Sequence, residues 1–333
     1  MVTITGIAKD ERSARIVLAT TSEPDDSRTG RLVAAVGAVD TVLLAQGDGA
    51  LPNVLDATEG ELWRRQLAPR LLAPVVEIAM KDTDKLGLQV LIPGDKDWPS
   101  GLGALRDREP VALWTKGATS SLSTPIRGRV TFSGARAATA YGVHVTTELA
   151  VELSNADLFI VSGGAYGIDA AAHKAVLTVA GSTIAIMAGG LDRPYPSGNS
   201  DLLTRVGDLG VLVSELPPGA TPTKWRFLAR NRLMAALSAV TIIPEAGYRS
   251  GSLHVAKEAH ELGRAVGAVP GPITSAVSAG THRLIREGIA RMVTTTQDVR
   301  EMVEDKHGKM TRSFGATNPS RYRSSSATTH RAL

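Results

Sequence analysis

Six short apolar runs dominate the second half of the chain. They lie at residues 130–132, 158–161, 183–187, 211–213, 240–243 and 265–269. Each is apolar almost throughout, as expected of strands that are buried on both faces. Longer stretches with helical periodicity separate the runs. Repeated strand–helix units of this kind predict an α/β domain with a parallel, doubly wound sheet.

The first part of the chain has a different, helical pattern. Residues 1–85 predict short helices, because the apolar positions between 58 and 80 recur at helical spacing. Pro69 and Pro74 are expected to split that stretch, since proline interrupts a helix. We therefore expect a small all-helical module before the sheet.

The sheet domain is expected to span residues 86–304. Periodic stretches near 282–288 and 297–304 predict its last helices. Residues 305–333 are rich in Ser, Thr and Arg and have almost no apolar periodicity, which predicts a disordered tail.

Composition narrows the functional classes. The chain has 333 residues, of which 43% are apolar, and it has no cysteine. The missing cysteines exclude a disulfide scaffold, a thiol nucleophile and a cysteine-ligated zinc site. We find no run of about 18 apolar residues and no secretory pattern at the N-terminus. The sequence therefore predicts a cytoplasmic protein without a membrane span.

The net charge of +4 is unevenly placed. Residues 305–333 contain six Lys and Arg and one acid, a net charge of +5, and the other 304 residues contain 31 cations and 32 anions, a net charge of −1. The basic excess therefore belongs to the tail. A nucleic-acid site on the folded body must come from local arrangement rather than from bulk charge.

Glycine and serine follow nearly every predicted strand. Because ligands bind beyond the carboxyl ends of parallel strands, and because glycine lets backbone N–H groups approach an anion, several such loops together predict a phosphate-binding rim. The alternative is that the glycines only allow tight turns. The candidate residues in these loops are Ser133, Gly134, Ser162, Gly163, Gly167, Gly189, Ser250 and Gly251.

Charged residues accompany two of these loops. Arg136 lies within the first loop, where a guanidinium can hold a phosphate, and Lys174 on the second helix could add a point charge. Asp169 and His173 are four residues apart and share a helical face. This pair could act as acid and base, but we favour the interpretation that it orders the glycine-rich loop.

The densest basic patch outside the tail is the run Lys224–Arg232, with four cations and two aromatic residues in nine positions. Aromatic rings interleaved with Arg suit a single nucleic-acid strand, because rings stack on bases and Arg neutralises phosphates. We expect Arg230, Asn231 and Arg232 to begin a helix with their N–H groups facing an anion. The alternative is a capped helix with Phe227 in the core.

Two common nucleotide motifs are absent. We find neither Gly-x-Gly-x-x-Gly at the first helix nor the Gly-x4-Gly-Lys-Ser/Thr pattern of P-loop proteins. The sequence therefore argues against a dinucleotide cofactor and against ATP hydrolysis by a P-loop.

Taken together, these motifs resemble the DNA-processing protein A family (DprA, also called Smf). The resemblance covers about 95–295 and rests on order and spacing. Its elements are Ser133-Gly134-Ala135-Arg136, Ser162-Gly163-Gly164-Ala165-Tyr166-Gly167-Ile168-Asp169, Gly189-Gly190, Phe227 with Arg230-Asn231-Arg232, Glu245 with Arg249-Ser250-Gly251, and Pro270-Gly271.

The resemblance implies an extended Rossmann-like domain that binds single-stranded DNA, preceded by a helical module of sterile-alpha-motif or helix-hairpin-helix type. It further implies that the protein protects incoming strands in natural transformation, helps to load the RecA recombinase, works as a homodimer and has no catalytic residue, metal or cofactor. Arg136 and Lys174 match basic positions of the family's DNA pocket, and the Arg230–Arg232 element matches its Arg-Asn-Arg motif.

Three positions depart from the family pattern. Tyr166 stands where the family often has Arg, so stacking could replace a charge contact, and Leu228 stands where it often has Pro. Many members end in a winged-helix domain, for which residues 305–333 are too few.

The alternative function is an enzyme or a sensor on a similar scaffold. Nucleotide phosphoribohydrolases of the LOG type carry a catalytic Glu after a Gly-Thr pair. If Gly251-Ser252 is the equivalent pair, Val255 stands at the position of that Glu and cannot act as an acid. A sensor of a small nucleotide signal also remains open, although the run Lys224–Arg232 favours a longer polyanion.

Overall fold

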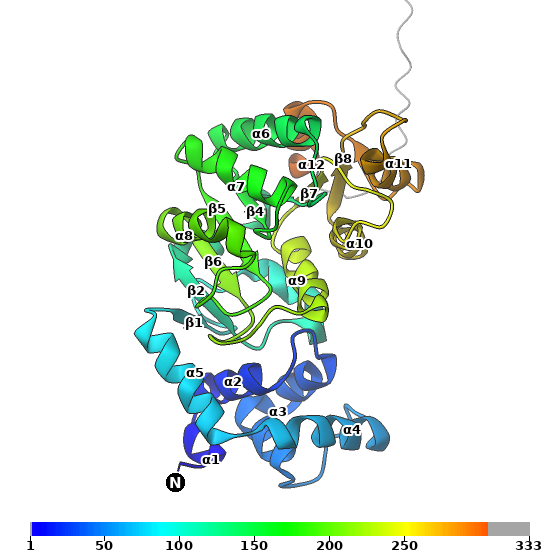
Figure 1. Cartoon of the computed structure of the whole chain (residues 1–333). Coiled ribbons are helices and arrows are strands. Elements are labelled where there is room, and N and C mark those ends of the chain that lie inside the picture. Colours follow the sequence, from blue (N-terminus) through cyan, green and yellow to red (C-terminus); the bar gives the residue numbers. More distant parts are fainter. Residues whose placement is uncertain (1, 306–333) are drawn as a thin grey trace, which may run out of the picture.

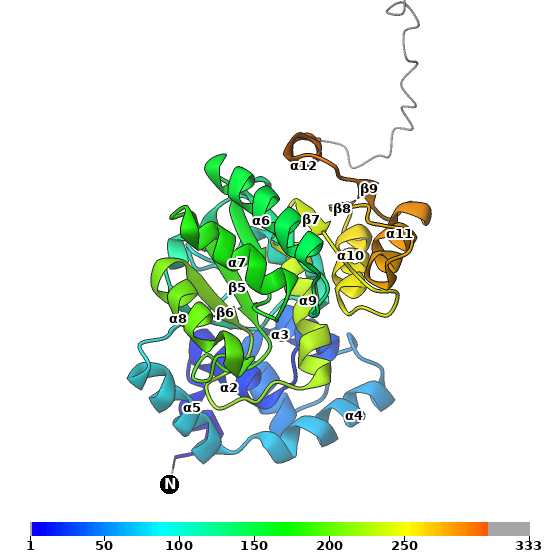
Figure 2. The same cartoon turned by 45° about the horizontal axis from the view of Figure 1, so that its top comes forward.

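The structure is a computed structural model that describes residues 2–305 (Figures 1 and 2). The prediction of a disordered basic tail lies outside the described residues, apart from Asp305. In Figure 1 the N-terminal helices gather at one end of the molecule and the sheet lies beyond them.

Five α-helices make up the N-terminal part. Trp63, Leu18, Leu32 and Val76 meet in its core, where burial of apolar side chains stabilises the packing. The proline effect is as expected, because Pro69 lies in a short 3₁₀ turn and Pro74 in the first turn of the next helix. The helices are α1 (Ile4–Ile7), α2 (Glu11–Thr21), α3 (Ser27–Gln46), α4 (Ala57–Leu67) and α5 (Ala73–Lys85).

Helix α3 is the one helix of the described residues that is long and apolar enough to cross a membrane by length and composition. Buried core helices of soluble proteins can have the same length and composition. Here Leu32 and Val42 of α3 are buried in the N-terminal core, and the helix kinks at Gly37, whose φ is +83°. The length and composition of α3 are therefore weak evidence for a membrane span.

Nine strands form one sheet in the order β1-β2-β6-β5-β4-β3-β7-β8-β9. The six predicted strands are all present and pair in parallel, so the predicted fold class is confirmed. Three short strands were not predicted: β1 and β2 extend one edge in antiparallel pairing, and β9 adds to the other. The bounds are β1 (Gln89–Leu91), β2 (Leu113–Gly117), β3 (Arg129–Phe132), β4 (Phe159–Ser162), β5 (Thr183–Met187), β6 (Val211–Ser214), β7 (Val240–Ile243), β8 (Ala265–Ala268) and β9 (Arg291–Met292).

Helices cover both faces of the sheet. Leu153 of α6, Val176 of α7 and Met302 of α12 pack on one face, and Leu233 of α9 and Val255 of α10 pack on the other. This arrangement is doubly wound, as the alternating pattern predicts. The bounds are α6 (Ala140–Asn155), α7 (Ile168–Thr178), α8 (Ser200–Leu209), α9 (Lys224–Ala236), α10 (Ser252–Glu261), α11 (Ala279–Arg286) and α12 (Thr296–Glu304).

The order of the strands creates a switch point. From β3 the chain proceeds outward through β4, β5 and β6, and then crosses back to place β7 on the other side of β3. The loops after β3 and β7 therefore leave toward opposite faces. In open α/β sheets a crevice at this point binds ligands.

Candidate nucleic-acid interface

A carboxylate of the protein itself occupies the N-terminus of α6, next to the switch point. Glu245 is 3% exposed and accepts hydrogen bonds from the backbone N–H of Thr139 at 2.8 Å and from its hydroxyl at 2.7 Å. In doubly wound folds this helix terminus is where a nucleotide phosphate binds. The negative charge of this buried carboxylate repels a phosphate. The carboxylate also accepts the Thr139 N–H, which a bound phosphate would otherwise accept. The position therefore does not suit a mononucleotide.

Four side chains from three loops and helices meet at the carboxyl edge of the sheet. The guanidinium carbons of Arg136 and Arg230 lie 5.2 and 5.6 Å from the ring centroid of Phe227, and the Tyr195 ring meets Phe227 edge-on at 5.9 Å. We call these four residues the Phe227 cluster. Such distances allow cation–π attraction. Arg136 is exposed and Tyr195 is 50% exposed, so the cluster presents a cation and aromatic rings to solvent.

Arg230 anchors the Phe227 cluster to buried backbone carbonyls of the sheet domain. Its Nη1 donates to the carbonyl oxygens of Gly163 at 2.8 Å and Ile186 at 2.7 Å. A Cβ on Gly163 would lie 1.9 Å from that nitrogen, so the close approach requires glycine. Burial lowers the pKa of Arg230, and the nearby Asp169 carboxylate opposes this. Arg230 thus ties the loop after β4 and the end of β5 to α9.

Asp169 and His173 have separate roles. Asp169 is buried and accepts the backbone N–H of Ala165 at 3.3 Å, which supports the interpretation that it orders the glycine-rich loop. Burial raises the pKa of Asp169, although Arg230 acts against this. His173 Nδ1 lies 2.7 Å from the hydroxyl of Thr183, inside the core. Neither side chain faces solvent, so the acid–base alternative is not supported.

We predict a pH-dependent stability from His173. Burial lowers the pKa of His173 from 6.5 to about 4, so between these pH values the unfolded chain binds a proton that the folded chain does not. Stability from this group is present above pH 6.5 and is lost as the pH falls, by roughly 3 kcal/mol at pH 4. Between pH 7 and pH 4, denaturant unfolding should show a loss of unfolding free energy that is about 3 kcal/mol smaller for His173→Leu than for the wild type. An equal loss in both proteins would contradict the assignment.

The predicted start of α9 is wrong. The helix begins at Lys224, with Thr223 as its cap, so the N–H groups of Arg230–Arg232 lie in the second and third turns and bond within the helix. The side chain of Arg232 is 1% exposed, pairs with both oxygens of Glu215 at 2.8 and 2.7 Å, and lies 3.1 Å from Asp25. Arg232 is therefore a structural cation, and Asn231 is buried beside it in the helix.

Other predicted phosphate contacts are also buried. The hydroxyl of Ser162 donates to the Phe132 carbonyl at 2.8 Å and is fully buried, and Ser133 is 6% exposed. Gly189 is buried, and Gly167, with φ +73°, brings its backbone so close to Ala135 that a Cβ would lie 2.1 Å from that carbonyl oxygen. These loops build the rim by close packing, and their contact with a phosphate through backbone N–H groups stays a prediction.

The remaining predicted residues lie at the surface. Tyr166 is 47% exposed, and its hydroxyl accepts the backbone N–H of Gly198 at 3.3 Å, which joins the loops after β4 and β5. Lys174 and Lys224 are exposed but lie on different helices, α7 and α9. Gly251 is exposed, and Gly134, Phe227 and Ser250 are half-buried.

Tyr195 is a residue of the Phe227 cluster that the sequence did not predict as a site residue. The available signal was an aromatic residue followed by Pro in the loop after the third predicted strand, which is weak by itself. Its place beside Phe227 depends on packing between the loop after β5 and α9. Within residues 2–305 no group of three or more His, Asp or Glu side chains could hold a metal ion.

A model of the family described as DNA recombination-mediator protein A matches residues 89–304. A putative DNA processing protein DprA from Mycobacterium tuberculosis is 42% identical over 296 residues, which are 86% of this chain and 73% of that protein.

Two solved structures are similar over most of their length. DprA from Streptococcus pneumoniae has a TM-score of 0.70 at 31% identity, covering 90% of this chain and 97% of that one. DNA processing protein A from Helicobacter pylori, described for its single-stranded DNA binding mode, has a TM-score of 0.59 at 33% identity, covering 65% of this chain and 95% of that one.

Proposed function

This chain belongs to the DNA recombination-mediator protein A family, and from that premise we propose that it binds single-stranded DNA along the carboxyl edge of its sheet. The observation that carries the proposal is the Phe227 cluster, in which the exposed Arg136 lies over an aromatic ring. The single-stranded DNA binding mode described for the H. pylori relative supports it. In this proposal residues 86–304 carry the DNA surface and residues 1–85 form the helical module.

A single strand fits this surface better than a duplex. Exposed rings at Tyr166, Tyr195 and Trp225 can stack only on bases that are unpaired and accessible. The cations that accompany them are few, and the body of the protein has a net charge near zero. Binding therefore depends on stacking together with a small number of phosphate contacts.

The first test is a titration of the wild type with a single-stranded oligonucleotide and with a duplex of equal length, at several salt concentrations. We expect at least tenfold tighter binding of the single strand, since each stacked base contributes about 1–3 kcal/mol that a duplex cannot supply. Equal affinity for the two forms would overturn the proposal. Deletion of residues 305–333 in parallel separates the tail's contribution from that of the sheet domain.

Family membership extends the proposal to the later steps. We include protection of incoming DNA, delivery to the RecA recombinase during transformation or recombination, and action as a cytoplasmic homodimer. We propose that the protein binds DNA without catalysing a reaction and without a cofactor. If RecA filaments form on single-stranded DNA no faster with the protein than without it, the delivery step is wrong.

The enzyme or nucleotide-sensor alternative is weakened by two positions. Glu245 occupies the helix terminus that would hold a nucleotide phosphate. Val255, at the position of the hydrolase Glu, is 1% exposed in α10 and offers no acid. Release of a free base from a nucleoside monophosphate by the purified protein would favour the alternative.

A further inference from the structure

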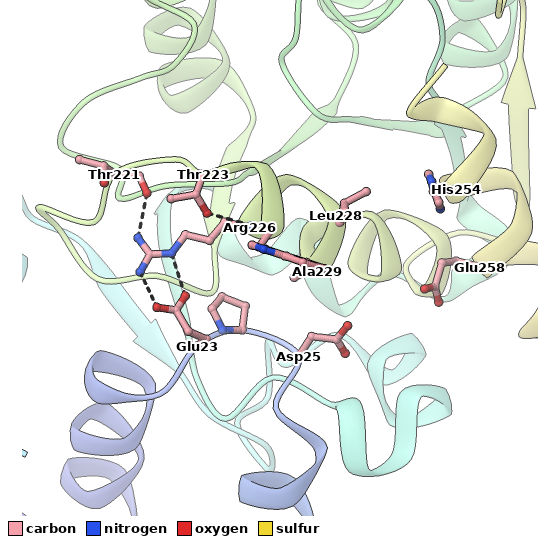
Figure 3. Close-up of a pocket in the computed structure, with 11 residues that line it drawn as sticks. Glu23, Asp25, Thr221, Thr223, Arg226, Leu228, Ala229, His254 and Glu258 are labelled. Carbon is pink, nitrogen blue, oxygen red and sulfur yellow. Dashed lines mark hydrogen bonds and ion pairs between the residues drawn. The ribbon is translucent and has the colours of Figure 1, made fainter. Parts of the chain in front are cut away.

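A cleft lies on the side of α9 that faces the N-terminal helices. It is a cavity of about 800 Å³. Its walls come from Glu23 and Pro24 of the turn between α2 and α3, from Trp225 and Leu228 of α9, and from His254 and Glu258 of α10 (Figure 3). We call it the α9 cleft. Its size is within the range of sites that take small organic groups.

Trp225 gives this cleft an unusual wall. Its side chain is 79% exposed, whereas Trp63 and Trp114 are 1% and 0% exposed. Tryptophan is normally stabilised by burial of its large apolar ring. Because Trp225 remains exposed to water, we interpret it as part of a binding surface. Trp225 lies in the first turn of α9, two positions before Phe227. Residues two positions apart point to different sides of a helix, so the α9 cleft and the Phe227 cluster lie on different sides of the N-terminal end of α9.

The charges around the α9 cleft are already paired. Glu23 accepts from Arg226 at 3.0 and 3.2 Å, and Arg108 holds Asp25 at 2.7 and 2.9 Å and Glu258 at 3.1 and 3.0 Å. Figure 3 shows Arg226 turned toward Glu23 across the cleft. Because Arg226 and Arg108 are both bound to carboxylates, neither guanidinium is available to hold a phosphate in the cleft. The cleft suits a flat, uncharged ring whose phosphates remain outside, near the exposed Lys224.

We propose that the α9 cleft is a nucleobase subsite of the DNA surface, in which a base of the bound single strand stacks on Trp225. The inference rests on the proposed function and adds to it that the N-terminal helices, through Pro24 and Glu23, form part of the DNA site. In this proposal the backbone phosphates pass the Phe227 cluster, and the strand then rounds the N-terminal end of α9 so that one base enters the cleft.

The test compares Trp225→Ala and Trp225→Phe with the wild type in binding a single-stranded 20-mer. We expect about tenfold weaker binding for Trp225→Ala with an unchanged salt slope, because stacking is lost but no phosphate contact is. Trp225→Phe should retain most of the affinity. An oligonucleotide of the same length without bases should bind the wild type and Trp225→Ala equally.

Ile78→Ala is the matched control, since Ile78 is 59% exposed on α5 and its removal also takes away an exposed apolar group. Tryptophan emission supplies a second readout, because the indole of Trp225 is open to acrylamide and the other three are buried or half-buried. We expect the single strand to shield Trp225 from acrylamide.

Two outcomes would overturn the subsite. One is unchanged affinity of Trp225→Ala together with no shielding of Trp225 by the single strand in the wild type, while substitution of Arg136 weakens binding. That result leaves the proposed function intact. The other is shielding of Trp225 by raised protein concentration alone, which would assign the cleft to a second copy of the chain. Failure of the wild type to bind any single strand would instead remove the proposed function itself.

Discussion

The double variant Arg136→Ala/Lys174→Ala is expected to bind single-stranded DNA about 25-fold more weakly than the wild type at about 0.1 M salt. Each phosphate contact on a single strand contributes about 0.7 to the slope of log affinity against log salt concentration. Loss of two contacts lowers the slope by about 1.4, which corresponds to that factor at this salt concentration. Removal of Arg136 also takes away the exposed cation over Phe227.

A matched variant separates local from bulk electrostatics. Arg65→Ala/Lys81→Ala removes the same charge from exposed positions on α4 and α5. Fluorescence anisotropy over a range of salt concentrations should show an affinity and a slope close to those of the wild type. If both double variants lose affinity equally, the Phe227 cluster has no special part in binding.

Glu215→Gln should lower the free energy of unfolding by about 3 kcal/mol. The guanidinium of Arg232 is 1% exposed, and Glu215 receives two of its hydrogen bonds, at 2.8 and 2.7 Å. Removal of one partner leaves a buried charge without compensation, which costs about 3–5 kcal/mol. Asp25, at 3.1 Å, stays in place and puts the expected loss near the lower end of this range.

Denaturant unfolding measures this loss, and two further variants test its cause. Glu287→Gln breaks the exposed Arg283–Glu287 pair, whose side chains are both 38% exposed, and should cost less than about 0.5 kcal/mol. Glu215→Leu combined with Arg232→Met replaces the buried pair by apolar groups and should recover most of the stability. An equal cost for the buried and the exposed pair would show that Arg232 is not held as described.

Much of the fold followed from local pattern. The six apolar runs became β3 to β8, because strands covered on both faces need apolar residues at every position. Strands β1 and β2 were not predicted, since Lys116 and Gly117 interrupt the apolar pattern and antiparallel pairing with β6 is a long-range contact. The family resemblance, read from the glycine-rich loops and their spacing, is confirmed.

The candidate site was predictable only in part. Arg136 was selected from its place in the first loop, and the structure leaves it exposed over Phe227. Arg232 was selected for the same reasons of charge and neighbourhood, but Glu215 and Asp25 bury it. Nothing local to Arg232 distinguishes it from Arg136, because its partners come from the residue after β6 and from the turn between α2 and α3.

By itself the sequence determined the six parallel strands and the helices that alternate with them, the position of the glycine-rich loops at the strand ends, and the family. These properties depend on periodicity and on backbone preferences, which act over a few residues. Only the tertiary structure decided which cations face water, that Glu245 fills the helix terminus at the switch point, and that Trp225 opens into a cleft shared with the N-terminal helices. Burial and ion pairing are set by residues far apart in the chain, so they emerge only when the chain is folded.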